Sequence, residues 1–262
     1  MSTLSYAVSD SATMLRRNLR HALRYPGMTI GIVGLPLIFL LLFVYVLGGA
    51  LGAGISGTPN GTEYVNYLAP GIFLLTASSA TVSTAVAVCS DMTEGIVARF
   101  RTMAISRTSI LIGHVVGSMI QTMVSIGLVI GVALLIGFRP TTDPVRWIGA
   151  IGLLVLLTLA LTWLAVALGL VAKNPEGASN VVLPLTILPF IGSAFVPTDS
   201  MAVGVRWFAE YQPFTSIIET LRGLLMGTPI GNNAVIAVAW CIGIALASYL
   251  WAKTLFSRDP AR

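Results

Sequence analysis

Uncharged polar side chains recur inside two of the long apolar stretches of this sequence. They are Thr76, Ser78, Ser79, Thr81, Ser83 and Thr84 in the first stretch, and Gln121, Thr122 and Ser125 in the second. In an apolar environment such groups either bond a neighbouring helix or line a path for a solute that carries polar groups. Gln121 costs most to bury, which makes it the better candidate for lining a path. The other path candidates are Thr122, Ser125, Ser79 and Ser83, with helix packing as the alternative.

Residue types suited to covalent, metal or nucleotide chemistry are scarce. The run Gly54-Ile55-Ser56-Gly57 resembles the nucleophile pattern of intramembrane serine proteases, whose serine needs a histidine within hydrogen-bond reach. We expect His21 and His114 on the opposite side of a bilayer from Ser56. Neither histidine has carboxylates or cysteines at ligand spacing, so we expect no metal site. The sequence contains no G-x-x-x-x-G-K-[ST] phosphate loop, so we expect that the chain is not itself an ATPase or another enzyme.

The elements that must position these side chains are apolar. Of the 262 residues 56% are hydrophobic and only 10% are charged, and the mean hydropathy is +0.89. Soluble domains carry about 25% charged residues. Six long stretches lack charges, and each exceeds the roughly 20 residues that a helix needs to cross a bilayer. The sequence therefore predicts an all-α membrane protein with six transmembrane helices, near 28–50, 68–90, 110–137, 148–172, 179–197 and 232–252, in a single domain over 1–262.

The distribution of cations predicts the orientation. With both termini on one side, eleven of the 15 Lys and Arg residues lie on that side. The opposite side holds Arg139, Arg146, Arg206 and Arg222. Because cytoplasmic loops carry the excess of cations, both termini are expected in the cytoplasm, in a bacterial inner (plasma) membrane. The cations adjoin the span ends and form no separate basic domain, so we expect no nucleic-acid partner.

The N-terminal lead, residues 1–26, predicts an amphipathic helix. Leu15 and Leu23 lie on one side of it, whereas Arg16, Arg20 and Arg24 form a parallel stripe. Such a helix is suited to the lipid headgroup plane. Two roles remain open, a topology anchor and a contact with a cytoplasmic partner.

A second amphipathic helix is predicted over 91–108, between the second and third spans. Ile96, Phe100 and Met103 share one face, while Glu94 and Arg101 share another. An apolar ridge with flanking charges can insert into a groove of a partner protein in a fixed register. A solvated interfacial loop helix is the alternative.

The segment 198–231 carries several charges, so we do not expect it to cross the membrane fully. Its apolar residues nevertheless share helical faces. Pro213 suits the first turn of a helix and Gly227 the end of one. We expect two short helices that dip partway into the outer leaflet, a re-entrant pair; surface amphipathic helices are the alternative.

Several stretches, in order along the chain, resemble the ABC type-2 export permeases, and in particular their daunorubicin-resistance-type drug-efflux branch. They are Glu94–Arg101 with Met103–Arg107, Lys173–Ala178, Ser193–Pro197, Gln212-Pro213 and Leu221–Leu225. One departure is Ala104, where the family commonly has a proline; it affects the expected end of the helix.

The resemblance implies six membrane helices, an N-terminal interfacial helix, a cytoplasmic coupling helix and a re-entrant pair before the last span. It also implies two permease subunits, identical or homologous, with two separate ATP-binding cassette subunits that bind ATP and Mg. The chain itself would need no cofactor. The residues expected to couple to the ATPase are Glu94, Gly95, Arg99, Phe100, Arg101 and Met103.

The function expected from these observations is export of amphiphilic drug-like or lipid-like compounds. A lipid or polysaccharide exporter of the same family is the main alternative. An ion-coupled carrier would place a charge at mid-membrane, and no predicted span has one near its centre.

Overall fold

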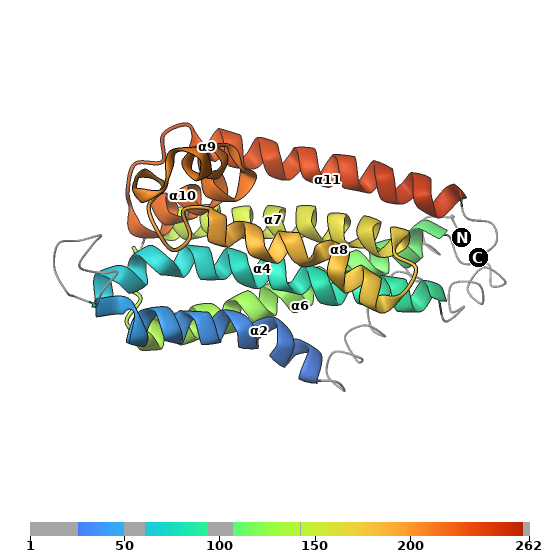
Figure 1. The fold of residues 1–262 in the computed structure, drawn as a ribbon, viewed down its shortest axis with the longest axis horizontal. Helices are drawn as coiled ribbons and strands as arrows, with labels where there is room; N and C mark the ends of the chain where they lie inside the picture. Colours follow the sequence, from blue (N-terminus) through green and yellow to red (C-terminus); the bar gives the residue numbers. More distant parts are fainter. Residues whose placement is uncertain (1–25, 50–60, 94–106, 142, 259–262) are drawn as a thin grey trace.

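The computed structural model describes residues 26–49, 61–93, 107–141 and 143–258, and within them the chain is helical, without strands (Figure 1). The all-α expectation is therefore confirmed for this part of the chain. The helices are α2 (Pro26–Leu41), the π-helix η1 (Leu42–Val46), α4 (Gly61–Thr93), α6 (Arg107–Ile136), α7 (Pro144–Val171), α8 (Pro175–Ile187), the 3-10 helices η2 (Leu188–Ile191) and η3 (Thr198–Ser200), α9 (Val203–Tyr211), α10 (Pro213–Met226) and α11 (Asn233–Arg258).

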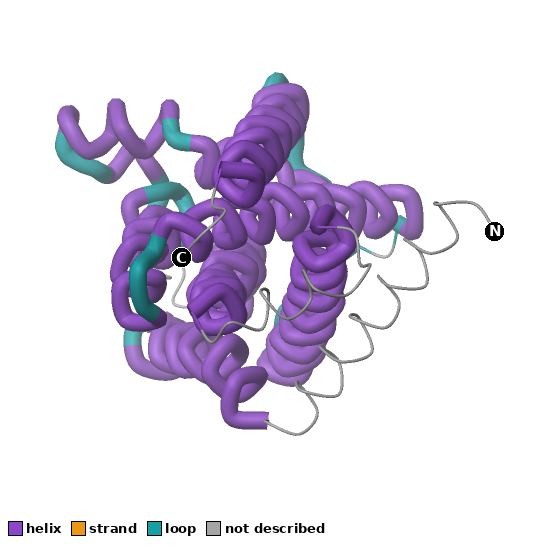
Figure 2. Tube along the Cα trace, turned by 90° about the vertical axis from the view of Figure 1, so that its right-hand side faces the viewer, coloured by secondary structure: helices purple, strands orange, loops and turns teal. Residues whose placement is uncertain are grey.

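The long helices form an elongated bundle with α4 at its centre. Helices α2, α4, α6, α7, α8 and α11 run along the long axis, and Figure 2 looks along this bundle. Helix α4 packs against α2, α6, α7, α8 and α10. The short helices α9 and α10 lie at one end of the bundle, where α4 begins, and the end of α4 and the start of α6 lie at the other (Figure 1).

Four of the described helices are long and apolar enough to cross a bilayer, namely α4, α6, α7 and α11. The predicted first and fifth spans appear as shorter helices. Helix α2 contains Pro36 and continues as the π-helix η1, whereas α8 has 13 residues and contains Pro184 before it tightens into η2. Proline removes a backbone donor, and Pro189 in η2 cannot supply the N–H that would continue the α-helix, which fits the end of α8 at Ile187.

Local signals in the sequence set several helix ends. The side chain of Asp143 accepts a hydrogen bond from the backbone N–H of Val145 at 3.0 Å, and Asn174 Oδ1 accepts one from Gly177 N at 2.7 Å. Both caps satisfy donors that a helix start leaves unpaired. Helix α10 begins at Pro213 and ends at Gly227, which has a φ of +78°, as the sequence predicts. Glycine adopts this left-handed conformation without the steric cost of a Cβ.

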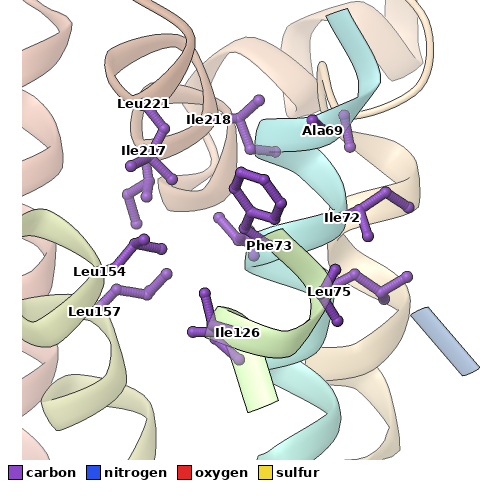
Figure 3. Close-up of a cluster of buried hydrophobic side chains, with 14 of the residues drawn as sticks. Ala69, Ile72, Phe73, Leu75, Ile126, Leu154, Leu157, Ile217, Ile218 and Leu221 are labelled. Atoms are coloured by element: carbon purple, nitrogen blue, oxygen red, sulfur yellow. The ribbon is translucent and has the colours of Figure 1, made fainter. Parts of the chain in front are cut away.

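The core gathers around Phe73 of α4. Figure 3 shows Ile217, Ile218 and Leu221 of α10 beside Phe73, with Leu154 and Leu157 of α7 and Ile126 of α6 nearby. Each of these side chains is almost fully buried. Lipid tails are as apolar as leucine, so within a membrane these contacts stabilise by close packing more than by removal from water.

Two glycines of the bundle allow backbones to approach closely. A Cβ on Gly71 of α4 would lie 2.7 Å from Ala194 Cβ, and one on Gly169 of α7 would lie 2.6 Å from the carbonyl oxygen of Ala85. The sequence also offers four-spaced pairs such as Gly127 and Gly131 of α6. In the described part of the chain no atom comes within 4 Å of a Cβ built on either, so this pair mediates no close approach between the described helices.

Large apolar side chains cover the outside of the bundle. Val235, Leu246 and Leu250 of α11 are exposed, as are Val124 and Leu135 of α6. An exposed apolar surface of this extent belongs in lipid or against another protein. Together with the four long apolar helices, it identifies a multi-pass membrane protein.

Candidate functional site

The residues predicted to couple to an ATPase, Glu94, Gly95, Arg99, Phe100, Arg101 and Met103, lie outside the described residues. Their role therefore stays a prediction. Two described helices flank this segment, because α4 ends at Thr93 and α6 begins at Arg107.

A histidine–carboxylate pair joins these two flanking helices. His114 Nε2 of α6 lies 3.1 Å from Asp91 Oδ2 of α4, and both side chains are largely shielded. The expectation that His114 is isolated, since no carboxylate or cysteine occurs at ligand spacing, is therefore wrong in one respect: the packing of α4 against α6 brings Asp91 to it. The pair holds α4 and α6 together close to the predicted coupling segment.

The path candidates of α4 lie on a half-buried stripe. Ser79 and Ser83 share one helical face with Val82, Val86 and Ser90, all of intermediate exposure, whereas most of the remaining α4 side chains are buried. The Ser83 hydroxyl donates to the carbonyl oxygen of Ala80 at 2.9 Å. Among the described residues, the hydroxyl of Ser79 is buried and has no hydrogen-bond partner.

The path candidates of α6 are more enclosed. Thr122 and Ser125 are buried, and Gln121 is half-buried. Thr122 Oγ1 donates to the carbonyl oxygen of Ser118 in its own helix at 2.8 Å. In the described part of the chain, the Ser125 hydroxyl has no hydrogen-bond partner. The structure thus places the two candidate groups on adjacent, mutually packed helices.

Most of the buried hydroxyls bond a carbonyl of their own helix. Thr76 Oγ1 donates to Ile72 O at 2.8 Å, and Thr84 Oγ1 donates to Ala80 O at 3.0 Å. Such bonds satisfy the hydroxyl without a second helix. For these residues the main role is therefore close packing of the helices, and not hydrogen bonding between them.

The strongest polar site of the described chain surrounds Arg222 of α10, whose side chain is only 10% exposed. Its Nη2 donates to the carbonyl oxygens of Ser193 at 2.7 Å and Tyr67 at 3.2 Å, and its Nε donates to the same Tyr67 oxygen at 3.3 Å. Nη1 pairs with Glu219 Oε1 at 2.6 Å. The guanidinium also lies 3.8 Å from the centre of the Tyr67 ring. A buried charge is tolerated only when it is paired and hydrogen-bonded in this way.

One of these carbonyl acceptors, Ser193 O, belongs to a break in the helical chain, residues 192–196, which we call the 192–196 turn. The Tyr67 hydroxyl donates to Ser193 O at 3.1 Å, and the Tyr64 hydroxyl donates to Phe195 O at 3.4 Å. Non-helical backbone at membrane depth requires partners for its polar groups. Tyr64, Tyr67 and Arg222 supply them, and we call these residues with Ser193 and Glu219 the α4–α10 junction.

Three further polar atoms adjoin this junction. Among the described residues, Ser193 Oγ, Gln212 Oε1 and Thr215 Oγ1 are buried without a hydrogen-bond partner. The Gln212 and Thr215 side chains lie beside Gly192, where a Cβ would lie 2.8 Å from Gln212 Nε2 and 2.9 Å from Thr215 Oγ1.

The neighbouring helix α9 presents a contrasting, exposed charge cluster. Arg206 lies 2.7 Å from both Asp199 and Glu210. The hydrogen bond to Glu210, and then the charges of Glu210 and Asp199, raise the pKa of the Arg206 guanidinium. Trp207 and Tyr211 of the same helix are exposed, as expected of a helix in a membrane–water interface.

The sequence predicts Arg222 only as a cation of the outer side and as part of a stretch that resembles the family. Its burial could not be predicted locally, because Leu221 and Leu225 share one helical face and Arg222 lies to one side of that face. The acceptors in the 192–196 turn could not be found from spacing, since they depend on how the helices pack.

The fold and this arrangement define a multi-pass helical membrane protein with a buried polar junction at one end and no cluster suited to a metal ion among its described residues. Residues 11–226 match the model of the ABC-2 type transporter family, and the chain belongs to that family.

Curated relatives carry permease names. The chain is 29% identical over 241 residues to the daunorubicin resistance ABC transporter permease protein DrrB1 of Streptomyces coeruleorubidus. The aligned residues make up 92% of this chain and 80% of the relative. It is 24% identical over 217 residues to the probable doxorubicin resistance ABC transporter permease protein DrrC of Mycobacterium tuberculosis, covering 83% of this chain and 77% of the relative.

Proposed function

We propose that the chain is the transmembrane permease subunit of an ATP-driven ABC exporter that moves amphiphilic, drug-like compounds out of the cell. The observation that carries the proposal is membership of the ABC-2 type transporter family with relatives named as drug-resistance permeases. Four long apolar helices and the lack of a phosphate loop in the sequence support it.

The proposed topology has six crossings, made by α2, α4, α6, α7, α8 with η2, and α11. Both termini then lie in the cytoplasm of a bacterial cell, as the loop cations favour. Helices α9 and α10 form the pair that enters the outer leaflet between the last two crossings, and the lead 1–26 lies in the inner headgroup plane.

Energy enters from a separate ATP-binding cassette subunit that holds ATP and Mg. The contact surface is the coupling segment with Glu94, Gly95, Arg99, Phe100, Arg101 and Met103. Two permease subunits, identical or homologous, complete the exporter. The ATPase changes the permease only if it binds the inward-open and outward-open states with different affinity.

The proposed substrates are amphiphiles of the kind that the relatives' names mention, daunorubicin and doxorubicin. The half-buried stripe of α4 offers hydroxyl groups at Ser79 and Ser83 beside apolar side chains, without a charge. Gln121, Thr122 and Ser125 of α6 are the further path residues. A stripe of this kind fits an apolar molecule with a few hydrogen-bonding groups.

The test is co-purification of the chain with the ATPase encoded beside it, followed by doxorubicin uptake into inverted membrane vesicles. We expect uptake only when both subunits and ATP are present. The double variant Glu94→Ala, Phe100→Ala should insert normally but recover less ATPase and take up less drug. The matched control removes the same residue types from α9, in Glu210→Ala with Phe208→Ala, and should behave as wild type. Normal uptake and ATPase recovery in the coupling variant would contradict the docking role; a lipid taken up in place of the drug would favour a lipid exporter.

A further inference from the structure

We propose that Arg222 is a positioning residue of the transport cycle, which fastens α10 and the 192–196 turn to α4 so that they move with it. This inference rests on the proposed function of the chain as a permease. It concerns a residue at the end of the bundle where α4 begins, whereas the predicted coupling segment follows the other end of α4 in the sequence.

The first step is the number of elements that Arg222 joins. Its guanidinium bonds the carbonyl oxygens of Tyr67 in α4 and Ser193 in the 192–196 turn, while its own backbone belongs to α10. A planar guanidinium with five donors in a fixed fork can hold several acceptors at once, and a lysine ammonium cannot reproduce that geometry. Replacing Arg222 therefore removes the hydrogen bonds that join α10 to α4 and to the turn, whereas Glu219 joins the network only within α10.

The second step is the reach of α4. This helix has 33 residues, which corresponds to about 50 Å at 1.5 Å per residue. It begins at the end of the bundle where α10 lies and ends at Thr93, directly before the coupling segment (Figure 1). A displacement received next to Thr93 is therefore carried by one continuous element to the α4–α10 junction.

The third step is the place where α4 is weakest. Pro70 lies inside α4 and removes one backbone hydrogen bond of the helix. The contacts with the 192–196 turn lie on both sides of it, through Tyr64 and Tyr67 before Pro70 and through Gly71 after it. The junction thus braces α4 at its proline, so that the helix transmits a movement where it would otherwise bend.

The fourth step is that the junction has unused partners. Ser193 Oγ, Gln212 Oε1 and Thr215 Oγ1 are buried without hydrogen-bond partners among the described residues. The Gln212 and Thr215 side chains lie beside Gly192, and Ser193 is the residue whose carbonyl oxygen Arg222 bonds. A packed interface that switches needs a second set of contacts to replace the first. These atoms supply such a set when α10 shifts relative to the turn.

The test uses the permease with its partner ATPase in vesicles, and it measures ATP hydrolysis and drug transport on the same sample. The variants are Arg222→Gln and Arg222→Lys. The control is Arg206→Gln, which removes an exposed arginine of α9 that also pairs with carboxylates. We expect the Arg222 variants to keep ATP hydrolysis while the amount transported per ATP falls about tenfold, the equivalent of about 1.4 kcal/mol. A lysine that preserves the charge should not rescue this ratio.

The ratio separates positioning from stability, because a loss of folded protein lowers hydrolysis and transport together. If Arg222→Gln fails to insert, the Arg222→Lys variant carries the test. Wild-type transport per ATP in Arg222→Lys would overturn the proposal.

A second measurement does not depend on transport. Ser193 is only 1% exposed. A cysteine introduced there, in Ser193→Cys, is labelled with a membrane-impermeant maleimide in a background without the two native cysteines. We expect slow labelling with Arg222 present and fast labelling in Arg222→Gln. Equal labelling would overturn the positioning role. Absence of ATP-driven transport in the wild-type complex would instead contradict the proposed function, while the labelling result still decides the role of Arg222.

Discussion

The close approach of α4 and the 192–196 turn predicts a large effect of a single methyl group. In Gly71→Ala the new Cβ would lie 2.7 Å from Ala194 Cβ, 2.8 Å from Ala194 Cα and 2.9 Å from Ala194 O. Carbon atoms pack at about 3.5–4.0 Å, so the turn must move away by roughly 0.8 Å or more. Two of the three atoms are backbone, so no side-chain rotation relieves the contact. Overpacking of this kind costs about 1–3 kcal/mol.

The matched control is Gly127→Ala in α6, where no described atom lies within 4 Å of the new Cβ. Both variants gain the same helix propensity, about 1 kcal/mol, so this term cancels in the comparison. We expect Gly71→Ala to unfold more easily than Gly127→Ala by about 1–3 kcal/mol. The assay is unfolding of the purified permease in detergent, followed by tryptophan fluorescence. Equal stability of the two variants would refute the reasoning that α4 and the turn are in backbone contact.

Three further changes follow from single contacts. Relative to the Gly127→Ala control, Gly169→Ala places a Cβ 2.6 Å from a carbonyl oxygen of α4 and should lower the free energy of unfolding by about 1–3 kcal/mol in the same assay; equal values would show that α7 can move aside. Trp147→Phe removes the bond from Nε1 to Thr141 O at 2.9 Å and should cost about 1 kcal/mol, and a neutral result would mean that the loop is held by other bonds. Asp91→Ala removes the partner of His114 at 3.1 Å and should cost about 1.5–3 kcal/mol; the account of the α4–α6 flank is wrong if unfolding is unaffected.

The helical membrane class could be predicted from the sequence because charge-free stretches are a local property. The long stretches around α4, α6, α7 and α11 each gave a helix of spanning length. Proline and capping residues also act locally, which is why the start of α10 at Pro213 and its end at Gly227 were predictable.

The polar sites were harder to predict, because they depend on contacts between distant parts of the chain. Arg222 meets Tyr67 across 155 residues and Ser193 across 29. The spacing of the apolar residues around Arg222 indicated an amphipathic helix, and no local rule says that the arginine faces inward. The pairing of Asp91 with His114 was not predicted for the same reason. The close-packing glycines illustrate it too, since Gly71 approaches Ala194 and Gly169 approaches Ala85, both of which are far away along the chain.

The central claim is that an ATPase outside this chain drives the transport. The direct measurement is drug accumulation in vesicles that contain the permease alone, the permease with its partner ATPase, or the permease with a partner that binds ATP but cannot hydrolyse it. The account predicts accumulation only with the hydrolysing partner and no loss of it when ion gradients are collapsed. Accumulation driven by an ion gradient in vesicles with the permease alone, or ATP hydrolysis by the permease alone, would contradict it.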